Sequence, residues 1–107
     1  MDFKNYLKDI EHPTKNDKWD ISGIIKNRTN QRLTFDTKPL IKTKQGELGK
    51  FASLDTKADK MVFEEKDSFI IVDVEELISY CKNNKVKKVY LQDLISKLDW
   101  NIILPKK

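Results

Sequence analysis

The stretch RLTFDTKPL, residues 32–40, places an acid and a lysine two residues apart within a pattern typical of a β-strand. Leu33 and Phe35 share one parity, while Asp36 and Lys38 fall on the other. Because successive side chains of a strand point to opposite faces, this alternation predicts one apolar face and one polar face. The polar face has two interpretations: a metal-dependent nuclease centre, or the solvent side of a half-exposed strand.

A second strand pattern precedes this one, and a turn joins the two. Trp19 and Ile21 share one parity, Asp20 and Ser22 share the other, and the sequence NRTNQ at residues 27–31 is typical of a turn. Two strands that are joined this tightly should pair as an antiparallel hairpin. The sequence therefore predicts that Asp20 and Asp36 lie on neighbouring strands.

The position of the turn decides which residues face each other. If the turn is centred near Thr29, Lys38 faces Asp20 and Asp36 faces Ser22. Asp20 and Asp36 then become diagonal neighbours on one face, with their Cα atoms roughly 7 to 8 Å apart, so both carboxylates could reach one ion. A slip of one residue in the pairing would move the two carboxylates to different faces.

Two carboxylates and an amine on one face suit the hydrolysis of a phosphodiester. Mg²⁺ prefers oxygen ligands and keeps several waters, so a scissile phosphate and water could complete its coordination. The ion would lower the pKa of a bound water, and a nearby lysine could offset charge in the transition state. As the alternative, a solvent-exposed ion pair between Asp20 and Lys38 would contribute at most about 1 kcal/mol.

The arrangement resembles a known signature. Asp20, followed after fifteen residues by Asp36-Thr37-Lys38, resembles the PD-(D/E)XK motif of restriction-endonuclease-like nucleases, which include Holliday junction resolvases and small phage nucleases. The segment TKADKMVF at residues 56–63 is similar to the stretch of such enzymes that leads into the next strand. The resemblance implies that Asp20 and Asp36 bind Mg²⁺ or Mn²⁺, that Lys38 is the catalytic lysine, and that Glu11 is a candidate for a further metal-binding acid.

The remaining patterns predict a single α+β domain. Apolar residues at helical spacing predict a first helix over residues 3–10. The lysine- and glycine-rich stretch 39–50 predicts a mobile basic loop, in which residues 40–43 could form a short extra strand. Strands are predicted over residues 60–64 and 68–73, and the apolar run 69–72 indicates that the second strand is covered on both faces.

The carboxyl-terminal third begins with a helix start signal. Asp73-x-x-Glu76 fits a capping box for a helix over residues 74–83, and a further helix over 91–98 and a last strand over 100–104 follow. We therefore expect one domain over residues 1–107, with a central mixed sheet flanked by helices. The resemblance implies a restriction-endonuclease-like core over residues 1–73 and a helix-strand-helix-strand extension over 74–107.

The distribution of charge favours a polyanionic partner. The 107 residues carry a net charge of +4, and residues 24–60 contain nine basic groups against four acids. Such a patch favours DNA, although lysine-rich surfaces also serve solubility alone. Six basic residues are the candidates for contact with phosphates: Lys26, Arg28, Arg32, Lys42, Lys44 and Lys50.

The expected function is that of a metal-dependent DNA endonuclease or junction resolvase, which could act as a homodimer. The single cysteine, Cys81, cannot form an internal disulfide, and no signal peptide or membrane-spanning pattern is visible, so we expect a cytoplasmic protein that has no contact with a membrane. The alternative is a non-catalytic DNA-binding protein of a phage or mobile element, either a degenerate nuclease fold or a winged-helix module. A protein-binding accessory factor is a third class.

Overall fold

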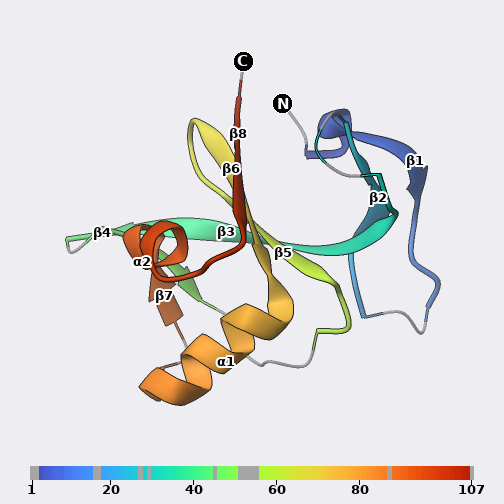
Figure 1. The fold of residues 1–107 in the computed structure, drawn as a ribbon. Coiled ribbons are helices and arrows are strands. Elements are labelled where there is room, and N and C mark those ends of the chain that lie inside the picture. The colour runs from blue at the N-terminus through green and yellow to red at the C-terminus, as the bar shows by residue number, and fades with distance from the viewer. Residues whose placement is uncertain are drawn as a thin grey trace.

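One long strand, β3, organises the molecule (Figure 1). The computed structural model describes residues 3–15, 18–26, 28, 30–44, 46–50, 56–86 and 88–106. Within these residues the strands are β1 (Leu7–Glu11), β2 (Ile21–Ile25), β3 (Leu33–Thr43), β4 (Gly46–Lys50), β5 (Lys60–Glu64), β6 (Ser68–Asp73), β7 (Lys88–Tyr90) and β8 (Asn101–Pro105). The helical elements are η1 (Phe3–Tyr6), α1 (Val74–Asn84) and α2 (Leu91–Ser96).

The described strands form one mixed sheet in the order β1-β2-β3-β5-β6-β8. The first part of β3 pairs antiparallel with β2 and parallel with β5, while β5, β6 and β8 pair antiparallel. The last part of β3 continues beyond this sheet and pairs with β4, which in turn pairs with β7. The mixed sheet and the α+β class are therefore as predicted, and the carboxyl-terminal elements belong to the same sheet as the rest.

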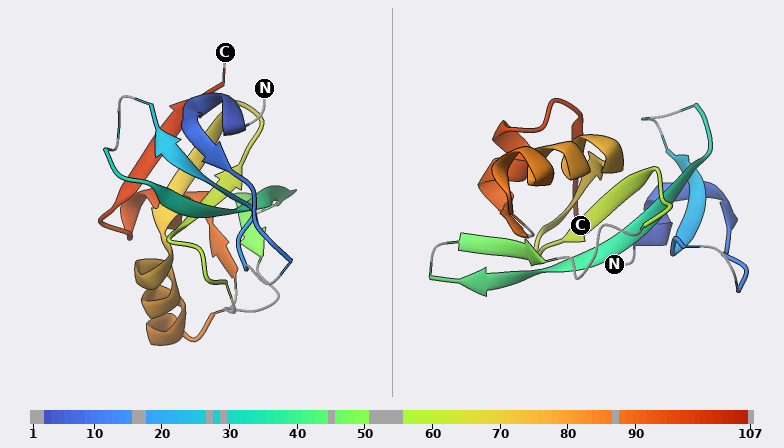
Figure 2. Two further views of the ribbon diagram at one scale, coloured as in Figure 1. Left: turned by 90° about the vertical axis from the view of Figure 1, so that its right-hand side faces the viewer. Right: turned by 90° about the horizontal axis from the view of Figure 1, so that it is seen from below.

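The centre of the sheet is buried on both faces, because each face carries its own apolar layer. Both helices lie on one face (Figure 2), where they cover a helix-side layer that includes Met61, Phe63 and Leu77. The sheet curls so that η1 and β1 come over the other face, and Phe3 and Leu7 there join a second layer. The prediction that helices flank the sheet therefore holds for one face only. No described helix has the length and apolar character needed to cross a membrane.

The helix predicted over residues 3–10 is wrong. Only Phe3–Tyr6 form a single helical turn, and Leu7–Glu11 are a strand whose Leu7 pairs with Ile25 of β2. Phe3 and Leu7 are buried, but Ile10 at the end of the same apolar pattern is 37% exposed. Pairing with β2 therefore overrides the local helical spacing, as tertiary context often does.

The stretch predicted as a mobile basic loop is a hairpin instead, and the short strand considered for residues 40–43 is the last part of β3. Leu40 of β3 pairs with Gly49 of β4, and Thr43 pairs with Gly46 at the turn. Gly46 has φ of 129°, which lies in a region that side chains strongly disfavour. Of the two glycines that suggested a loop, Gly46 lies at the turn and Gly49 lies within β4.

Helix α1 begins at the predicted capping residue. The Oδ2 atom of Asp73 accepts a hydrogen bond from the backbone N–H of Glu76 (3.1 Å), which satisfies a donor at the start of the helix. The Glu76 carboxylate does not complete a reciprocal box, because its Oε1 atom accepts the backbone N–H of Trp100 (3.0 Å). This contact ties the first turn of α1 to the segment before β8.

Candidate active site

The observed pairing of β2 with β3 brings Asp20 beside Asp36. Ile21 pairs with Phe35 and Ser22 with Thr34, so the prediction that Asp36 faces Ser22 and that Lys38 faces Asp20 is wrong by two residues. Since a shift of two preserves the face on which each residue lies, the carboxylates still meet. The N–H of Asp20 donates to the carbonyl of Phe35 (2.8 Å) and fixes Asp20 next to β3.

The shift follows from how β2 ends. The backbone N–H of Lys26 donates to the carbonyl of Tyr6 (2.9 Å), so it serves the amino-terminal segment and not the hairpin. The N–H of Arg28 then donates to the carbonyl of Ile25 (3.2 Å) and closes a tight turn directly after the strand. The connection is therefore centred earlier than Thr29, a position that the sequence alone does not reveal.

Asp20 is held in place by the strand that it faces. Its Oδ2 atom accepts hydrogen bonds from the backbone N–H of Thr37 (2.9 Å) and from the Thr37 hydroxyl (3.0 Å). Two donors on one oxygen hold the carboxylate in a fixed orientation. Asp20 is therefore an exposed but fixed acid at the edge of the hairpin.

Asp36 forms a carboxyl pair with Asp20. Burial of its half-buried side chain raises the pKa of Asp36 above 3.8, and the charge of Asp20 and a side-chain hydrogen bond to Asp20 raise it further. A hydrogen bond from Thr56 and the charge of Lys38 act in the opposite direction, but the net pKa of Asp36 is raised. Two acids in contact concentrate negative charge that a cation would neutralise.

Lys38 completes the predicted set. It lies two residues beyond Asp36 on β3, so the strand period gives both side chains the same face. Its ammonium is close enough to lower the pKa of Asp36, and its side chain is half-buried. The structure thus brings together Asp20, Asp36 and Lys38.

Thr56 is a member of the site that the sequence pattern missed. It lies in the segment before β5, and its side chain hydrogen-bonds Asp36. Asp59 ties this segment to β3, because its Oδ2 atom accepts the N–H of Thr34 (3.0 Å) and its own N–H donates to the carbonyl of Thr34 (3.0 Å). Strand alternation could not indicate Thr56, since the residue lies outside any strand.

Glu11 is not brought to the carboxyl pair. It pairs with Ser22 at the end of β1, and its side chain lies 3.9 Å from the guanidinium of Arg32. In the described part of the chain, no three or more His, Cys, Asp or Glu side chains gather into a group that could hold a metal ion. Two adjacent carboxylates nevertheless fit an ion of the Mg²⁺ type, which takes oxygen ligands and keeps waters.

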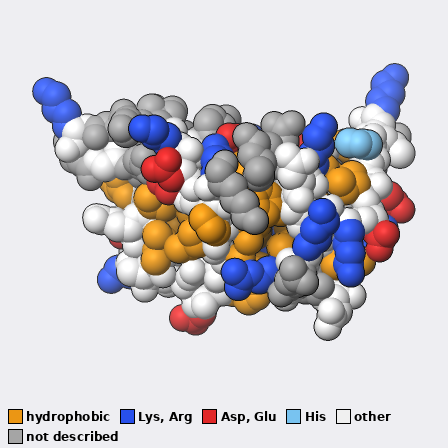
Figure 3. All heavy atoms as spheres, turned by 90° about the horizontal axis from the view of Figure 1, so that it is seen from above, with side chains coloured by type: hydrophobic (Ala, Val, Ile, Leu, Met, Phe, Trp, Pro, Cys, Tyr) orange, Lys and Arg blue, Asp and Glu red, His pale blue; other side chains and the backbone are white. Residues whose placement is uncertain are grey.

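The basic residues predicted to contact phosphates do not gather in one place. Arg28 and Arg32 are exposed before the start of β3, and Lys44 is exposed at its far end, so the two groups are separated by the eleven residues of the strand, on the order of 30 Å. On the face in Figure 3, Lys and Arg side chains are scattered from one end to the other and form no single patch. Lys26 is exposed after the end of β2, near Arg28 in the chain, and its Nζ donates to the carbonyl of Asn5 (3.3 Å). Two of the predicted residues have side chains outside the described part of the structure, Lys42 and Lys50.

The chain shows no match to a known protein in any of three comparisons. No protein-family model matches it, and neither the curated proteins nor the solved structures include a significant match. The likeness to PD-(D/E)XK nucleases therefore rests on Asp20, Asp36 and Lys38 themselves and on their meeting at one place in the fold.

Proposed function

We propose that this protein is a metal-dependent DNA endonuclease or junction resolvase that hydrolyses phosphodiester bonds at Asp20, Asp36 and Lys38. The observation that carries the proposal is the pairing of β2 with β3, which places the carboxylates of Asp20 and Asp36 side by side within reach of the Lys38 charge. Acidic groups that cluster in this way, with the pKa of one of them raised, are a mark of functional sites.

The carboxyl pair is difficult to explain as a stabilising feature. Two acids in contact repel when both are ionised, and the charge of Asp20 adds to burial in raising the pKa of Asp36. The surrounding contacts nevertheless hold the acids together, since Thr37 fixes Asp20 and Thr56 hydrogen-bonds Asp36. Because a bound cation would remove the repulsion between Asp20 and Asp36, the contacts that hold the two acids together support a cation-binding role.

The residues of the site have separate roles in this proposal. Asp20 and Asp36 would hold a divalent ion such as Mg²⁺ or Mn²⁺, which supplies Lewis-acid chemistry toward a phosphate and its attacking water. Lys38 offsets the negative charge that develops on the phosphate and orients the nucleophile. Thr37 and Thr56 are positioning residues, because they contact the acids and not the substrate.

DNA is the proposed substrate because positive charge flanks the acids. Arg32 lies four residues before Asp36 on the chain, and Lys44 lies eight residues after it, so DNA that lies along β3 could contact basic groups on both sides of the site. Such contacts fall off steeply as salt increases, since they release counterions. A homodimer would supply a second set of contacts and a second site.

A cleavage assay tests the proposal. Plasmid, single-stranded and branched DNA are incubated with the protein in Mg²⁺ or Mn²⁺ and in chelator, beside Asp36→Ala and Lys38→Ala. We expect metal-dependent cutting in the wild type and a loss on the order of 100-fold or more in each variant. Asp67→Ala and Lys66→Ala make the same charge changes in the exposed turn between β5 and β6, and they should cut like the wild type.

Other outcomes of the assay would decide against the proposal. Cutting that persists in chelator, or that survives unchanged in Asp36→Ala, would exclude this site. DNA binding without cutting under either metal would favour the non-catalytic DNA-binding alternative. Circular dichroism of each variant checks that the fold is retained.

A further inference from the structure

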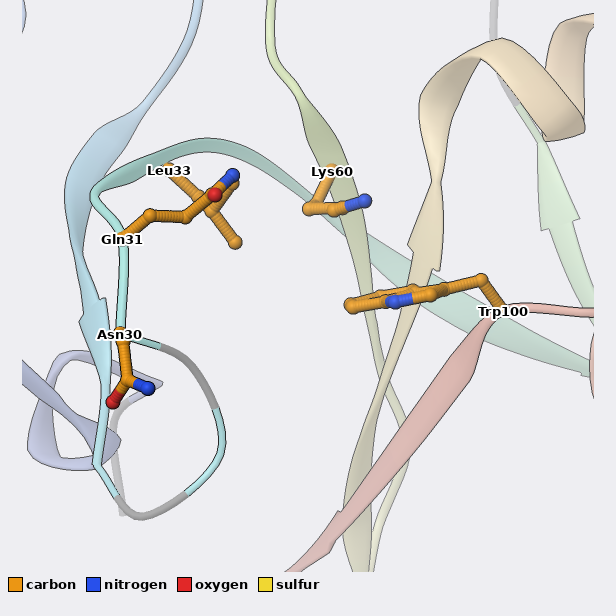
Figure 4. A pocket seen from close by; sticks show the side chains of 5 residues that line it. All are labelled: Asn30, Gln31, Leu33, Lys60 and Trp100. Carbon is orange, nitrogen blue, oxygen red and sulfur yellow. The ribbon is translucent and has the colours of Figure 1, made fainter.

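A pocket of ≈ 470 Å³ opens near the start of β3, and its lining includes none of Asp20, Asp36 and Lys38. Figure 4 shows its lining, which consists of Asn30, Gln31, Leu33, Lys60 and Trp100. Three segments contribute: the connection before β3, the first residue of β5, and the segment before β8. Its volume falls within the range of pockets that bind small ligands.

The lining combines two kinds of group that recognise aromatic bases. The amide side chains of Asn30 and Gln31 lie on one side, and the indole of Trp100 extends toward the pocket from the other (Figure 4). Each amide offers both donors and an acceptor, as the edges of a nucleobase do. A flat indole provides the surface on which a base can pack.

The charge of the pocket favours a base over a phosphate. Lys60 is the charged residue among those that line it, and its Nζ lies 2.8 Å from Oδ1 of Asp73 and 3.9 Å from the centroid of the Trp100 ring. The ammonium is therefore already neutralised by a carboxylate and covers one face of the indole. A neutral aromatic group fits the remaining space better than an anion does.

The indole is also held in place before any ligand arrives. The backbone N–H of Trp100 donates to the Glu76 carboxylate, the backbone N–H of Glu76 donates to Asp73, and Lys60, the partner of Asp73, contacts the indole ring. This chain of contacts anchors the Trp100 platform to the first turn of α1. A rigid platform binds at a lower entropic cost than a mobile one.

A second hollow overlaps this pocket. It also measures ≈ 470 Å³, shares Gln31, Leu33 and Lys60 with the first pocket, and extends to Thr56. The two hollows together therefore reach from Trp100 to Thr56.

We propose that the pocket of Asn30, Gln31 and Trp100 takes an unpaired nucleobase from a bound DNA strand. The identity of the ligand rests on the proposed function, since a DNA substrate is what would bring a base here. Bases inside a continuous duplex are stacked and paired, so the pocket would select strands that are single, frayed or branched.

Binding measured without cleavage tests this pocket. In chelator, the wild type is titrated with a single-stranded oligonucleotide and with one of equal length that consists of abasic sites. We expect the oligonucleotide with bases to bind about 5- to 100-fold more tightly, in line with one stacked base. Trp100→Ala and Asn30→Ala should remove most of this preference, while Trp100→Phe should retain part of it.

Matched controls separate the pocket from the fold and from the active site. Ile103→Ala, on the exposed side of β8, should keep the full preference, and Asp36→Asn should keep it while it abolishes cutting. Equal affinity for the two oligonucleotides, or an unchanged preference in both Asn30→Ala and Trp100→Phe, would overturn the pocket. A base preference in a protein that never cuts DNA would support the pocket and overturn the nuclease.

Discussion

At the scale of single residues, the most informative contact is the one between two acids. The pKa of Asp36 is raised by burial and by the charge of Asp20, and Thr56 and Lys38 only partly oppose this. In its folded state Asp36 therefore holds its proton more tightly than in the unfolded chain. The contribution of Asp36 to folding stability should then fall as pH rises from about 3.8 through the raised pKa.

Asp36→Asn should make the metal-free protein more stable at neutral pH, because asparagine resembles the protonated acid and removes the repulsion with Asp20. Below the ordinary pKa of 3.8 the wild-type acid is protonated as well, so the difference should vanish there. Thermal unfolding in chelator, from about pH 3 to about pH 8, measures the difference. Asp67→Asn serves as the control, and a variant that is less stable than the wild type at neutral pH would contradict the repulsion.

The hydrogen bond from Thr56 gives a second prediction at this scale. Thr56→Val removes a bond that lowers the pKa of Asp36, so this pKa should rise further. Because a metal binds the ionised acid, the acidic limb of the pH–rate profile should move to higher pH, with a smaller change in the rate at its plateau. Thr56→Ser keeps the hydroxyl and should restore the wild-type profile. An unshifted limb in Thr56→Val would show that the contact does not influence Asp36.

At the scale of secondary-structure elements, Asp73 links α1 to the sheet. Burial raises the pKa of Asp73, but the hydrogen bond and charge of Lys60 and the N–H of Glu76 outweigh burial and lower it. A lowered pKa in the folded state stabilises the protein above pH 3.8, and this contribution is lost as the pH falls below that value. Part of the acid sensitivity of the fold should therefore come from this one residue.

Asp73→Asn should destabilise the protein by about 2 kcal/mol at neutral pH, because asparagine still caps α1 but leaves the part-buried ammonium of Lys60 without a charged partner. Urea unfolding measures the difference at neutral pH and again near pH 3, where it should shrink. Asp67→Asn controls for the loss of an exposed acid. A difference that stays constant across this pH range would show that the ion pair is not its source.

The sequence predicted elements well where one local signal was sufficient. Asp73 at the start of α1 and the apolar run that becomes β6 were recognised because capping and double-sided burial leave a mark in a few consecutive residues. The helix over residues 3–10 failed because a turn followed by a strand buries Phe3 and Leu7 equally well. Whether residues 3–10 form a helix or a turn and a strand depends on pairing with β2, and a local sequence pattern contains no information about a neighbouring strand.

The candidate site shows the same division. The parity of Asp20, Asp36 and Lys38 was predicted from the period of a strand, and the contact between the two acids agrees with it. The detailed register was not predicted, since it depends on where Lys26 leaves the hairpin. Thr56 could not be predicted, because the segment that carries it reaches Asp36 only after β3 and β5 have paired.

At the scale of the whole molecule, the sheet carries two apolar layers that share its central strands. Leu77 of α1 belongs to the helix-side layer, while Phe69 of β6 belongs to the other. Neighbouring residues of β6, such as Ile70 and Ile71, are buried in different layers. The loss of either layer should therefore expose the same strands, and we expect the domain to unfold in one step.

Two core variants and two tryptophans test this cooperativity. Leu77→Ala and Phe69→Ala should each lower the free energy of unfolding by about 3 to 5 kcal/mol. Trp19 packs against the helix-side layer and Trp100 against the other, so variants that keep one tryptophan report on each layer separately. Coincident midpoints in urea are expected for both reporters. Midpoints that separate in either core variant would show that the layers unfold independently.

The position of Asp36 within β3 determines where related chains can tolerate insertions and deletions. An added residue between Phe35 and Asp36 would turn the carboxylate into the apolar layer that holds Phe35, whereas lengthening the hairpin tip at Lys44 would leave both acids where they are. Related chains should therefore vary in length at that tip and keep a constant count along the first half of β3. A related chain with an insertion or deletion in the first half of β3 would keep the fold but lose any chemistry that depends on the two acids.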